Sequence, residues 1–262
     1  MSTANVNGIS VNYQIHGSGP VLIFIHGFGG NLLSWWQQIP EFSKYFTCLT
    51  YDQRSFGSTS DDIDNPRGKS EFANDLEALL DYLKIDSCSI VAHSMGARAA
   101  VGFSLRNAGR VKGLVISSAN GGCDNQESRA VRKLHKNNPP DLPKGMMRSL
   151  SVDFHETEPQ KSFLHRQIMR LNPKHPSDFL KVPTHLIGYS THEKLDALGI
   201  PIIFIVGMKD TLVAPRTIEI AASLVSGAEL FRMHNVGHST YYEDPETFNS
   251  IVLDFLNKKV YY

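Results

Sequence analysis

The chain has 262 residues, of which 41% are hydrophobic and 20% are charged, as in an ordinary globular protein. Its 26 basic residues balance its 26 acidic residues, so no net field attracts nucleic acid or an anionic membrane. Composition therefore argues against both of these partners, and the length suits one large α/β domain with a modest insertion.

The N-terminal stretch MSTANVNGIS lacks the basic patch and the apolar run of a signal peptide. The longest apolar runs, at 21–25 and 200–206, are far shorter than the roughly 20 residues that cross a bilayer. The three cysteines, Cys48, Cys88 and Cys123, are odd in number and lack CxxC spacing. These features predict a cytoplasmic protein with no membrane span, no disulfide framework and no zinc site.

Short runs rich in β-branched residues predict strands at 8–15, 21–26, 47–52, 87–93, 111–117, 201–207 and 228–233. After the first, these runs are almost continuously apolar, and they alternate with helical patterns at 70–83, 95–108, 215–225 and 245–256. Continuous apolar strands are typical of a parallel sheet that is covered on both faces. We predict an α/β fold with a mostly parallel central sheet flanked by helices.

Residues 123–199 interrupt this alternation with seven prolines and no convincing buried strand. Because the segment is too long for a simple crossover, we predict a helical cap or lid inserted between core segments 1–122 and 200–262. Most of its apolar side chains are expected to pack the cap on itself and on the core, and a few to line the ceiling of a pocket. These side chains are Met146, Met147, Leu150, Phe154, Phe163, Leu164, Ile168, Met169 and Phe179. Within the segment, the basic stripe 129–136 is interpreted as a solvated face, with an anion site as the alternative.

Ser94 lies in the stretch IVAHSMGARAA, between a predicted strand and a predicted helix. A sharp strand-to-helix turn strains the backbone at its central residue and brings the flanking residues together, which explains the small residues Ala92 and Gly96. Such a turn presents the hydroxyl at a helix N-terminus, where developing negative charge is favoured. The pattern matches the G-x-S-x-G nucleophile elbow, with alanine in place of the first glycine.

A glycine-rich loop, FIHGFGG at 24–30, follows another predicted strand. Its backbone can point N–H groups at one spot, and an oxyanion hole needs two such donors. The N–H groups of Phe28 and Met95 are the expected pair. A plain glycine turn is the alternative interpretation of this loop.

An acid and a base follow in the chain order that the elbow pattern requires. Asp210 comes just after the predicted strand 201–207, and His238 lies in a loop before the last predicted helix. We expect His238 to take the proton of Ser94 and Asp210 to hold the imidazole in the required tautomer. Asp124, seven residues beyond the strand that ends at 117, is the weaker alternative for the acid.

These motifs together resemble the α/β-hydrolase superfamily over nearly the whole chain. The resemblance is carried by NGISVNYQIHGSGPVLIFIHGFGG, YDQRSFGSTS, AHSMGA, IPIIFIVGMKDTLVAP and HNVGHSTYYEDPETFNSIVLDFL. In such proteins the second of these usually reads Asp-x-Arg-Gly-x-Gly-x-Ser, so Ser55 replaces one glycine. The resemblance implies the α/β-hydrolase fold and a hydrolase of the serine-nucleophile, esterase-like branch.

Serine at the elbow sets the chemistry that we expect. Relatives that open epoxides or split carbon–halogen bonds carry aspartate there, whereas serine suits attack on a carbonyl through an acyl-enzyme. We predict a carboxylic ester, lactone or thioester hydrolase that acts on a small molecule with an apolar acyl group and needs neither cofactor nor metal. A carbon–carbon bond hydrolase of diketones and a slow-turnover ligand sensor remain alternatives, and the sequence leaves the oligomeric state open.

Overall fold

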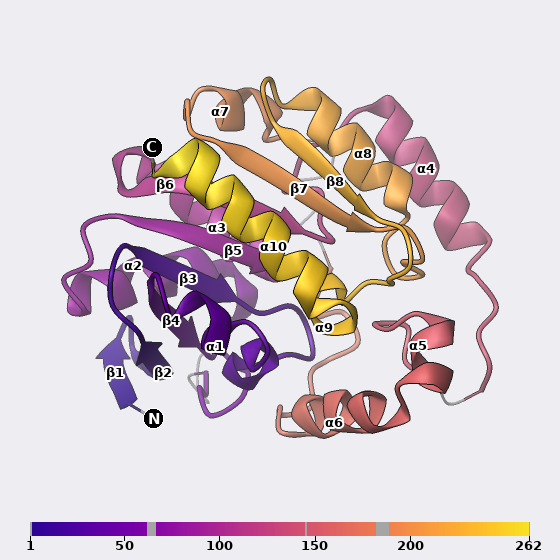
Figure 1. Cartoon of the computed structure of the whole chain (residues 1–262), viewed down its shortest axis with the longest axis horizontal. Coiled ribbons are helices and arrows are strands. Elements are labelled where there is room, and N and C mark those ends of the chain that lie inside the picture. The colour runs from indigo at the N-terminus through magenta and orange to yellow at the C-terminus, as the bar shows by residue number, and fades with distance from the viewer. Residues whose placement is uncertain (1, 62–66, 145, 182–188, 262) are drawn as a thin grey trace.

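The computed structural model describes residues 2–61, 67–144, 146–181 and 189–261. In these ranges one eight-stranded sheet crosses the molecule in the order β1-β2-β4-β3-β5-β6-β7-β8 (Figure 1). The strands are β1 (Ser2–Val6), β2 (Ile9–His16), β3 (Val21–Ile25), β4 (Thr47–Tyr51), β5 (Cys88–His93), β6 (Val111–Ser117), β7 (Ile202–Gly207) and β8 (Glu229–Met233). The seven strands predicted from the sequence are β2 to β8.

The sheet is mostly parallel, as predicted. Strands β4, β3, β5, β6, β7 and β8 pair in parallel, while β1 and β2 form an antiparallel edge. The sequence did not predict β1, because the strand is short, three of its five residues are polar and only Ala4 is buried. This strand is specified by pairing with β2 across the turn at Asn7 and Gly8, rather than by an apolar pattern of its own.

The described helices include the four that the sequence predicts, which are α2, α3, α8 and α10. Their bounds are α1 (Ile39–Phe42), α2 (Phe72–Tyr82), α3 (Gly96–Arg106), α4 (Gln126–Asn137), α5 (Val152–Thr157), α6 (Pro159–Arg170), α7 (His192–Asp196), α8 (Pro215–Leu224), α9 (Thr240–Glu243) and α10 (Pro245–Phe255). Shorter helical turns are η1 (Leu32–Trp35), η2 (Gly68–Glu71), η3 (Ala108–Arg110) and η5 (Leu256–Val260). Helix α10 begins at Pro245, and the Asp244 side chain caps it by accepting from Thr247 N–H at 3.0 Å.

Helices cover both faces of the sheet. Side chains of successive strand residues point to opposite faces, so they pack into two separate hydrophobic cores. Ile90 of β5 and Leu114 of β6 pack in one cluster with α2, α3 and α8. Their chain neighbours Val91 and Val115 pack in the other cluster with α1 and α10. Figure 1 shows α10 in front of the sheet and α3 behind it. Burial on both faces explains the continuous apolar runs of these strands.

The segment between β6 and β7 is helical in its described part, with no strand there. Helix α4 packs against α8, whereas α5 and α6 lie together beyond the carboxyl ends of the strands (Figure 1). We propose 123–199 as the cap, in which α5 and α6 are the parts that face the strand ends. In the basic stripe, Arg129 and Arg132 both pair with Asp124, at 2.8 and 2.7 Å.

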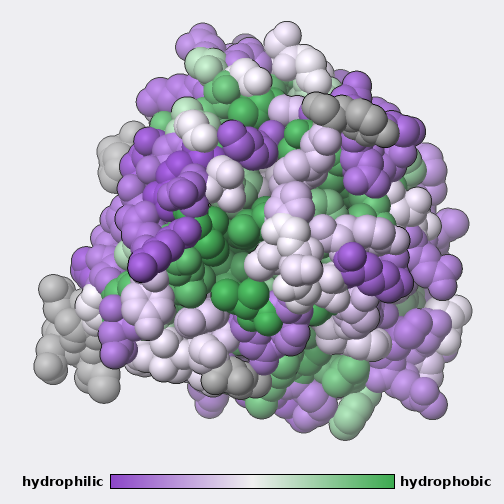
Figure 2. All heavy atoms as spheres, turned by 60° about the vertical axis from the view of Figure 1, so that its left-hand side comes forward, coloured by the Kyte–Doolittle hydropathy of each residue, from purple (hydrophilic) through white to green (hydrophobic). Residues whose placement is uncertain are grey.

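Figure 2 shows one face, on which hydrophilic residues surround an apolar patch near the centre. In the described part of the chain, no helix combines the length and the apolar character that crossing a bilayer requires.

Candidate active site

Ser94 occupies the turn between β5 and α3, with a left-handed φ of +50°. Such a conformation costs a non-glycine residue of order 1 kcal/mol, and it persists only where neighbours hold it. Here the Ser94 N–H donates to the carbonyl of Ser117 at 2.8 Å. A Cβ at position 96 would lie 2.6 Å from the carbonyl oxygen of Ile25. Gly96 is therefore required by the close approach of α3 to the end of β3.

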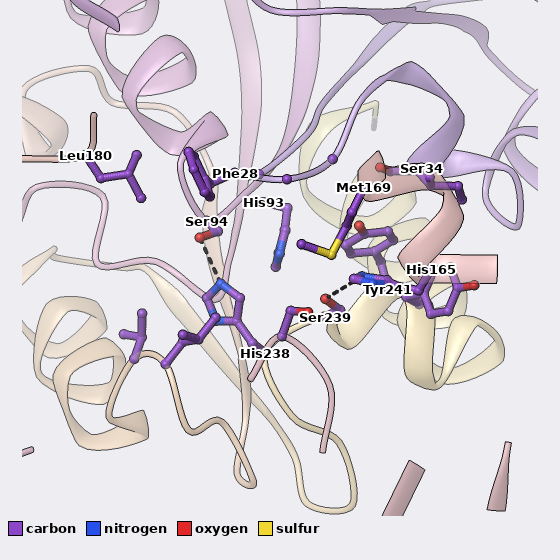
Figure 3. A pocket seen from close by; sticks show the side chains of 18 residues that line it. Phe28, Ser34, His93, Ser94, His165, Met169, Leu180, His238, Ser239 and Tyr241 are labelled. Carbon is purple, nitrogen blue, oxygen red and sulfur yellow. Dashed lines mark hydrogen bonds between the residues drawn. The ribbon is translucent and has the colours of Figure 1, made fainter. Parts of the chain in front are cut away.

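The structure brings together Ser94, His238 and Asp210, which come from three separate loops. The Ser94 Oγ lies 2.8 Å from His238 Nε2, as Figure 3 marks, and His238 Nδ1 lies 2.6 Å from Asp210 Oδ2. With the imidazole proton on Nδ1, the His238 ring donates to Asp210 and accepts the proton of Ser94. His238 and Asp210 are each 5% exposed, so water screens this chain of hydrogen bonds only weakly.

Both oxygens of the Asp210 carboxylate make hydrogen bonds. Its Oδ1 accepts from the backbone N–H groups of Leu212 and Val213, at 2.8 and 2.9 Å, which leaves Oδ2 for His238. The alternative acid, Asp124, is engaged elsewhere by Ser128, Arg129 and Arg132. Of the two aspartates that the sequence offered, Asp210 is therefore the one in contact with His238.

The two expected oxyanion donors flank the serine turn. Within the described residues, neither Phe28 N–H nor Met95 N–H donates a hydrogen bond to the protein. The Phe28 side chain contacts Phe56, with a distance of 5.8 Å between ring centroids, and also His175 and Phe179 of the segment after α6. These rings hold the loop that carries the Phe28 N–H.

Asn172, just after α6, ties the proposed cap to this loop. Its Nδ2 donates to the carbonyl of Gly29 at 2.6 Å, and its Oδ1 accepts from Gly57 N–H at 2.8 Å. Sequence reasoning missed this residue because its partners lie 115 and 143 positions away. An asparagine after a helix carries no local sign of such a bridge.

Asn172→Ala should lower the free energy of unfolding by about 1–2 kcal/mol, because two part-buried backbone groups lose their partner. Urea unfolding of the variant and the wild type measures this difference. Asn138→Ala, at the exposed end of α4, is the matched control. An Asn172→Ala loss no larger than that of Asn138→Ala would contradict the bridge.

Two further histidines line the site and were missed from the sequence. His93, directly before Ser94, is 4% exposed, with its ring centroid 5.0 Å from that of His238. Burial, reinforced by the nearby His238 and His165, holds the pKa of His93 well below 6.5. Burial also lowers the pKa of His165 on α6 to about 4, with His155 and His238 adding to the effect. Both rings are therefore neutral at pH 7.

Because the pKa of His165 falls from 6.5 to about 4 on folding, the unfolded chain binds a proton there that the folded chain excludes. The free energy of unfolding should therefore drop as pH falls from about 6.5 to 4, by about 3 kcal/mol from this residue. Urea titrations over this range on wild type and His165→Gln measure the effect, and the variant should show the shallower pH dependence. Equal slopes would contradict a buried neutral His165.

A cavity of about 270 Å³ opens beside Ser94, between the loops at the carboxyl ends of the strands and α6. Its lining comprises Gly27, Phe28, Gly29, Gly30, Ser34, His93, Ser94, Ser149, His165, Ile168, Met169, Leu180, Leu212, Val213, His238, Ser239, Tyr241 and Tyr242. Of the nine apolar cap side chains named from the sequence, Ile168 and Met169 line it, whereas Phe163 of the same helix is 64% exposed. The described residues contain no group of three or more His, Cys, Asp or Glu side chains placed to bind a metal ion.

Comparison with known proteins shows the family of the chain. A family model described as the alpha/beta hydrolase fold matches residues 20–245. The chain belongs to this family. Ser55 has a φ of +68°, the left-handed conformation that explains why glycine is usual at that position of the family loop.

The similarity to individual proteins covers almost the whole chain. The putative carbamate hydrolase RutD of Agrobacterium fabrum is 23% identical, over 94% of this chain and 98% of that protein. The structure of a thermophilic esterase from Thermogutta terrifontis is 20% identical, with a TM-score of 0.77 and coverage of 98% of both chains. A meta-cleavage product hydrolase from Pseudomonas fluorescens is 22% identical, also with a TM-score of 0.77 and coverage of 98% of both chains. Hydrolases therefore share this fold at full length.

Proposed function

We propose that the protein is a serine hydrolase that cleaves a carboxylic ester, lactone or thioester through an acyl-enzyme. The observation that carries this proposal is the continuous relay from Ser94 Oγ through His238 to Asp210, with distances of 2.8 and 2.6 Å. A buried relay of this kind activates a serine hydroxyl at neutral pH.

In the proposed reaction, Ser94 Oγ attacks the carbonyl carbon while His238 Nε2 takes its proton. The N–H groups of Phe28 and Met95 stabilise the oxyanion that forms, and each such donor is typically worth about 10²–10³ in rate. His238 then protonates the leaving oxygen or sulfur, the bond to carbon breaks, and the acyl group stays on Ser94. A water molecule, deprotonated by His238, then attacks the acyl carbon. The bond from this carbon to Ser94 Oγ breaks, His238 returns the proton to Oγ, and the acid is released.

Asp210 stabilises the imidazolium that arises twice in this cycle. It can do so because its Oδ1 is already satisfied by two backbone N–H groups, which fixes Oδ2 toward His238. The apolar side chains of Leu180, Leu212 and Val213 along the cavity support an apolar group on one side of the scissile bond. The proposed location is the cytoplasm, in keeping with three free, buried thiols, Cys48, Cys88 and Cys123.

Intact-mass analysis after treatment with a fluorophosphonate tests the proposal. One adduct is expected on the wild type and none on Ser94→Ala. A wild type that takes up no adduct would contradict an activated serine. A substrate panel then separates ester hydrolysis from carbon–carbon bond cleavage. Alkyl esters, thioesters and lactones test the first activity, and a dienoic diketone tests the second. The diketone is included because a meta-cleavage product hydrolase is among the structural neighbours.

A further inference from the structure

The cavity beside Ser94 has two chemically different ends. Figure 3 shows Phe28 and Leu180 on the side of Ser94, and His165, Ser239 and Tyr241 on the opposite side, with His93 and Met169 between them. Ser34 lies at the second end as well, and the backbone of Ser149 accepts from Ser239 N–H at 3.0 Å. The first end therefore suits an apolar group, whereas the second also offers hydroxyl and imidazole groups.

Polar atoms at the second end lack protein partners. His165 is 8% exposed, and its Nδ1 has no hydrogen-bond partner among the described residues; the same holds for the Oγ of Ser149. His165 Nε2 lies 3.5 Å from Ser239 Oγ, which is long for a hydrogen bond and therefore weak. The His165 Nδ1 and Ser149 Oγ atoms are enclosed by the protein, so the groups left with unused hydrogen-bonding capacity toward a ligand are His165 Nε2 and Ser239 Oγ, which share only this weak contact.

The lining carries no formal charge. The described residues around the cavity include no lysine, arginine, aspartate or glutamate, and burial keeps His93 and His165 neutral at pH 7. A carboxylate or ammonium group entering this end would lose its hydration without gaining an opposite charge. A neutral group that donates or accepts hydrogen bonds has no such cost.

We propose that the end of the cavity at His165 and Ser239 binds an uncharged hydrogen-bonding group of the substrate, and that His165 selects for it. This inference rests on the proposed hydrolase function and narrows it. The substrate class is a short ester or related acyl compound with a ketone, hydroxyl, ether or amide on one side of the scissile bond. Short substrates are indicated because a cavity of about 270 Å³ lies at the small end of ligand pockets.

Two pairs of esters test the proposal, one for each side of the scissile bond. Ethyl 4-oxopentanoate is compared with ethyl pentanoate, and 2-methoxyethyl acetate with butyl acetate, by kcat/KM from proton release. The wild type should favour the polar member of one pair, and His165→Leu should reduce that ratio about tenfold, since a site built to hydrogen-bond a group discriminates through it. His165→Gln keeps a donor and an acceptor and should retain most of the ratio.

Leu180→Ala is the matched control from the apolar end of the cavity. It should change both members of a pair together and leave their ratio as in the wild type. A wild type without preference in either pair, or a ratio that His165→Leu leaves unchanged, would overturn the subsite. Monoethyl succinate serves as the charged analogue, and its turnover at the rate of ethyl 4-oxopentanoate would overturn the selection for an uncharged group.

A binding measurement separates failure of the subsite from failure of the hydrolase function. N-Ethyl-4-oxopentanamide and N-ethylpentanamide, with the corresponding pair of acetamides, are titrated calorimetrically into Ser94→Ala, which needs no turnover. If no ester is hydrolysed, yet a polar amide binds about tenfold more tightly than its apolar partner and loses this advantage in Ser94→Ala/His165→Leu, the subsite stands and the hydrolase proposal falls. Equal binding of both members in both pairs overturns the subsite itself.

Discussion

Replacing Ser94 by alanine is expected to lower kcat for ester hydrolysis by roughly 10⁶-fold, because the groups of a serine relay act as a unit and the nucleophile cannot be bypassed. The change removes only the Oγ that lies 2.8 Å from His238. The left-handed backbone at position 94 is kept, along with the N–H bond to Ser117. Initial rates with a short aryl ester, at enzyme concentrations high enough to detect the residual activity, measure the loss.

Ser223→Ala is the matched control, since Ser223 is an exposed serine on α8 whose Oγ donates only to the carbonyl of Ile220. It should retain wild-type kcat and the fluorophosphonate adduct. Thermal melts of both variants check that the fold is intact. Ester hydrolysis by Ser94→Ala within tenfold of the wild type would show that another group is the nucleophile and would contradict the proposed mechanism.

Asp210→Asn is expected to lower kcat by about 10⁴-fold, because an amide facing His238 Nδ1 favours the wrong imidazole tautomer. The asparagine oxygen can still accept from the N–H groups of Leu212 and Val213, so the loop should keep its shape. The loss should therefore be in the chemistry and not in folding. We expect kcat from steady-state measurements and the rate of fluorophosphonate labelling to decrease together.

Asp124→Asn provides the comparison, because Asp124 is the other aspartate that the sequence offers as the acid. Its carboxylate pairs with Arg129 and Arg132, which are both substantially exposed, so the variant should lose little stability. Activity should remain within about twofold of the wild type. The reverse pattern, with Asp124→Asn inactive and Asp210→Asn active, would contradict the assignment of the acid.

Local sequence patterns determined most of the fold. A strand buried on both faces needs an uninterrupted apolar run, and a helix on a sheet needs an apolar stripe, so β2 to β8 and helices α2, α3, α8 and α10 were predictable. The nucleophile turn was predictable for a similar reason. The turn requires small residues within two positions of Ser94, and this pattern is visible in the sequence. The atoms that leave no room for a side chain at Gly96 nevertheless belong to the end of β3. Edge strand β1 was missed because pairing, and not burial, specifies it.

Only the tertiary structure decided which residues meet at the site. His238 contacts Asp210 from 28 positions away and Ser94 from 144 positions away. The local sequence favours Asp210 over Asp124 only through its closer distance to the end of a strand. The contacts separate them, because one carboxylate faces the imidazole and the other faces two arginines.

The same holds for His165 and Asn172, which no sequence pattern marked. A histidine on an amphipathic helix and an asparagine after it are ordinary residues until α6 is folded over the carboxyl ends of the strands. Burial then holds His165 neutral, and Asn172 reaches the carbonyl of Gly29. The sequence by itself thus determined the sheet, its main helices and the nucleophile turn, since these depend on neighbours along the chain. The pairing of the acid, the polarity of the cavity and the attachment of α6 depend on neighbours in space.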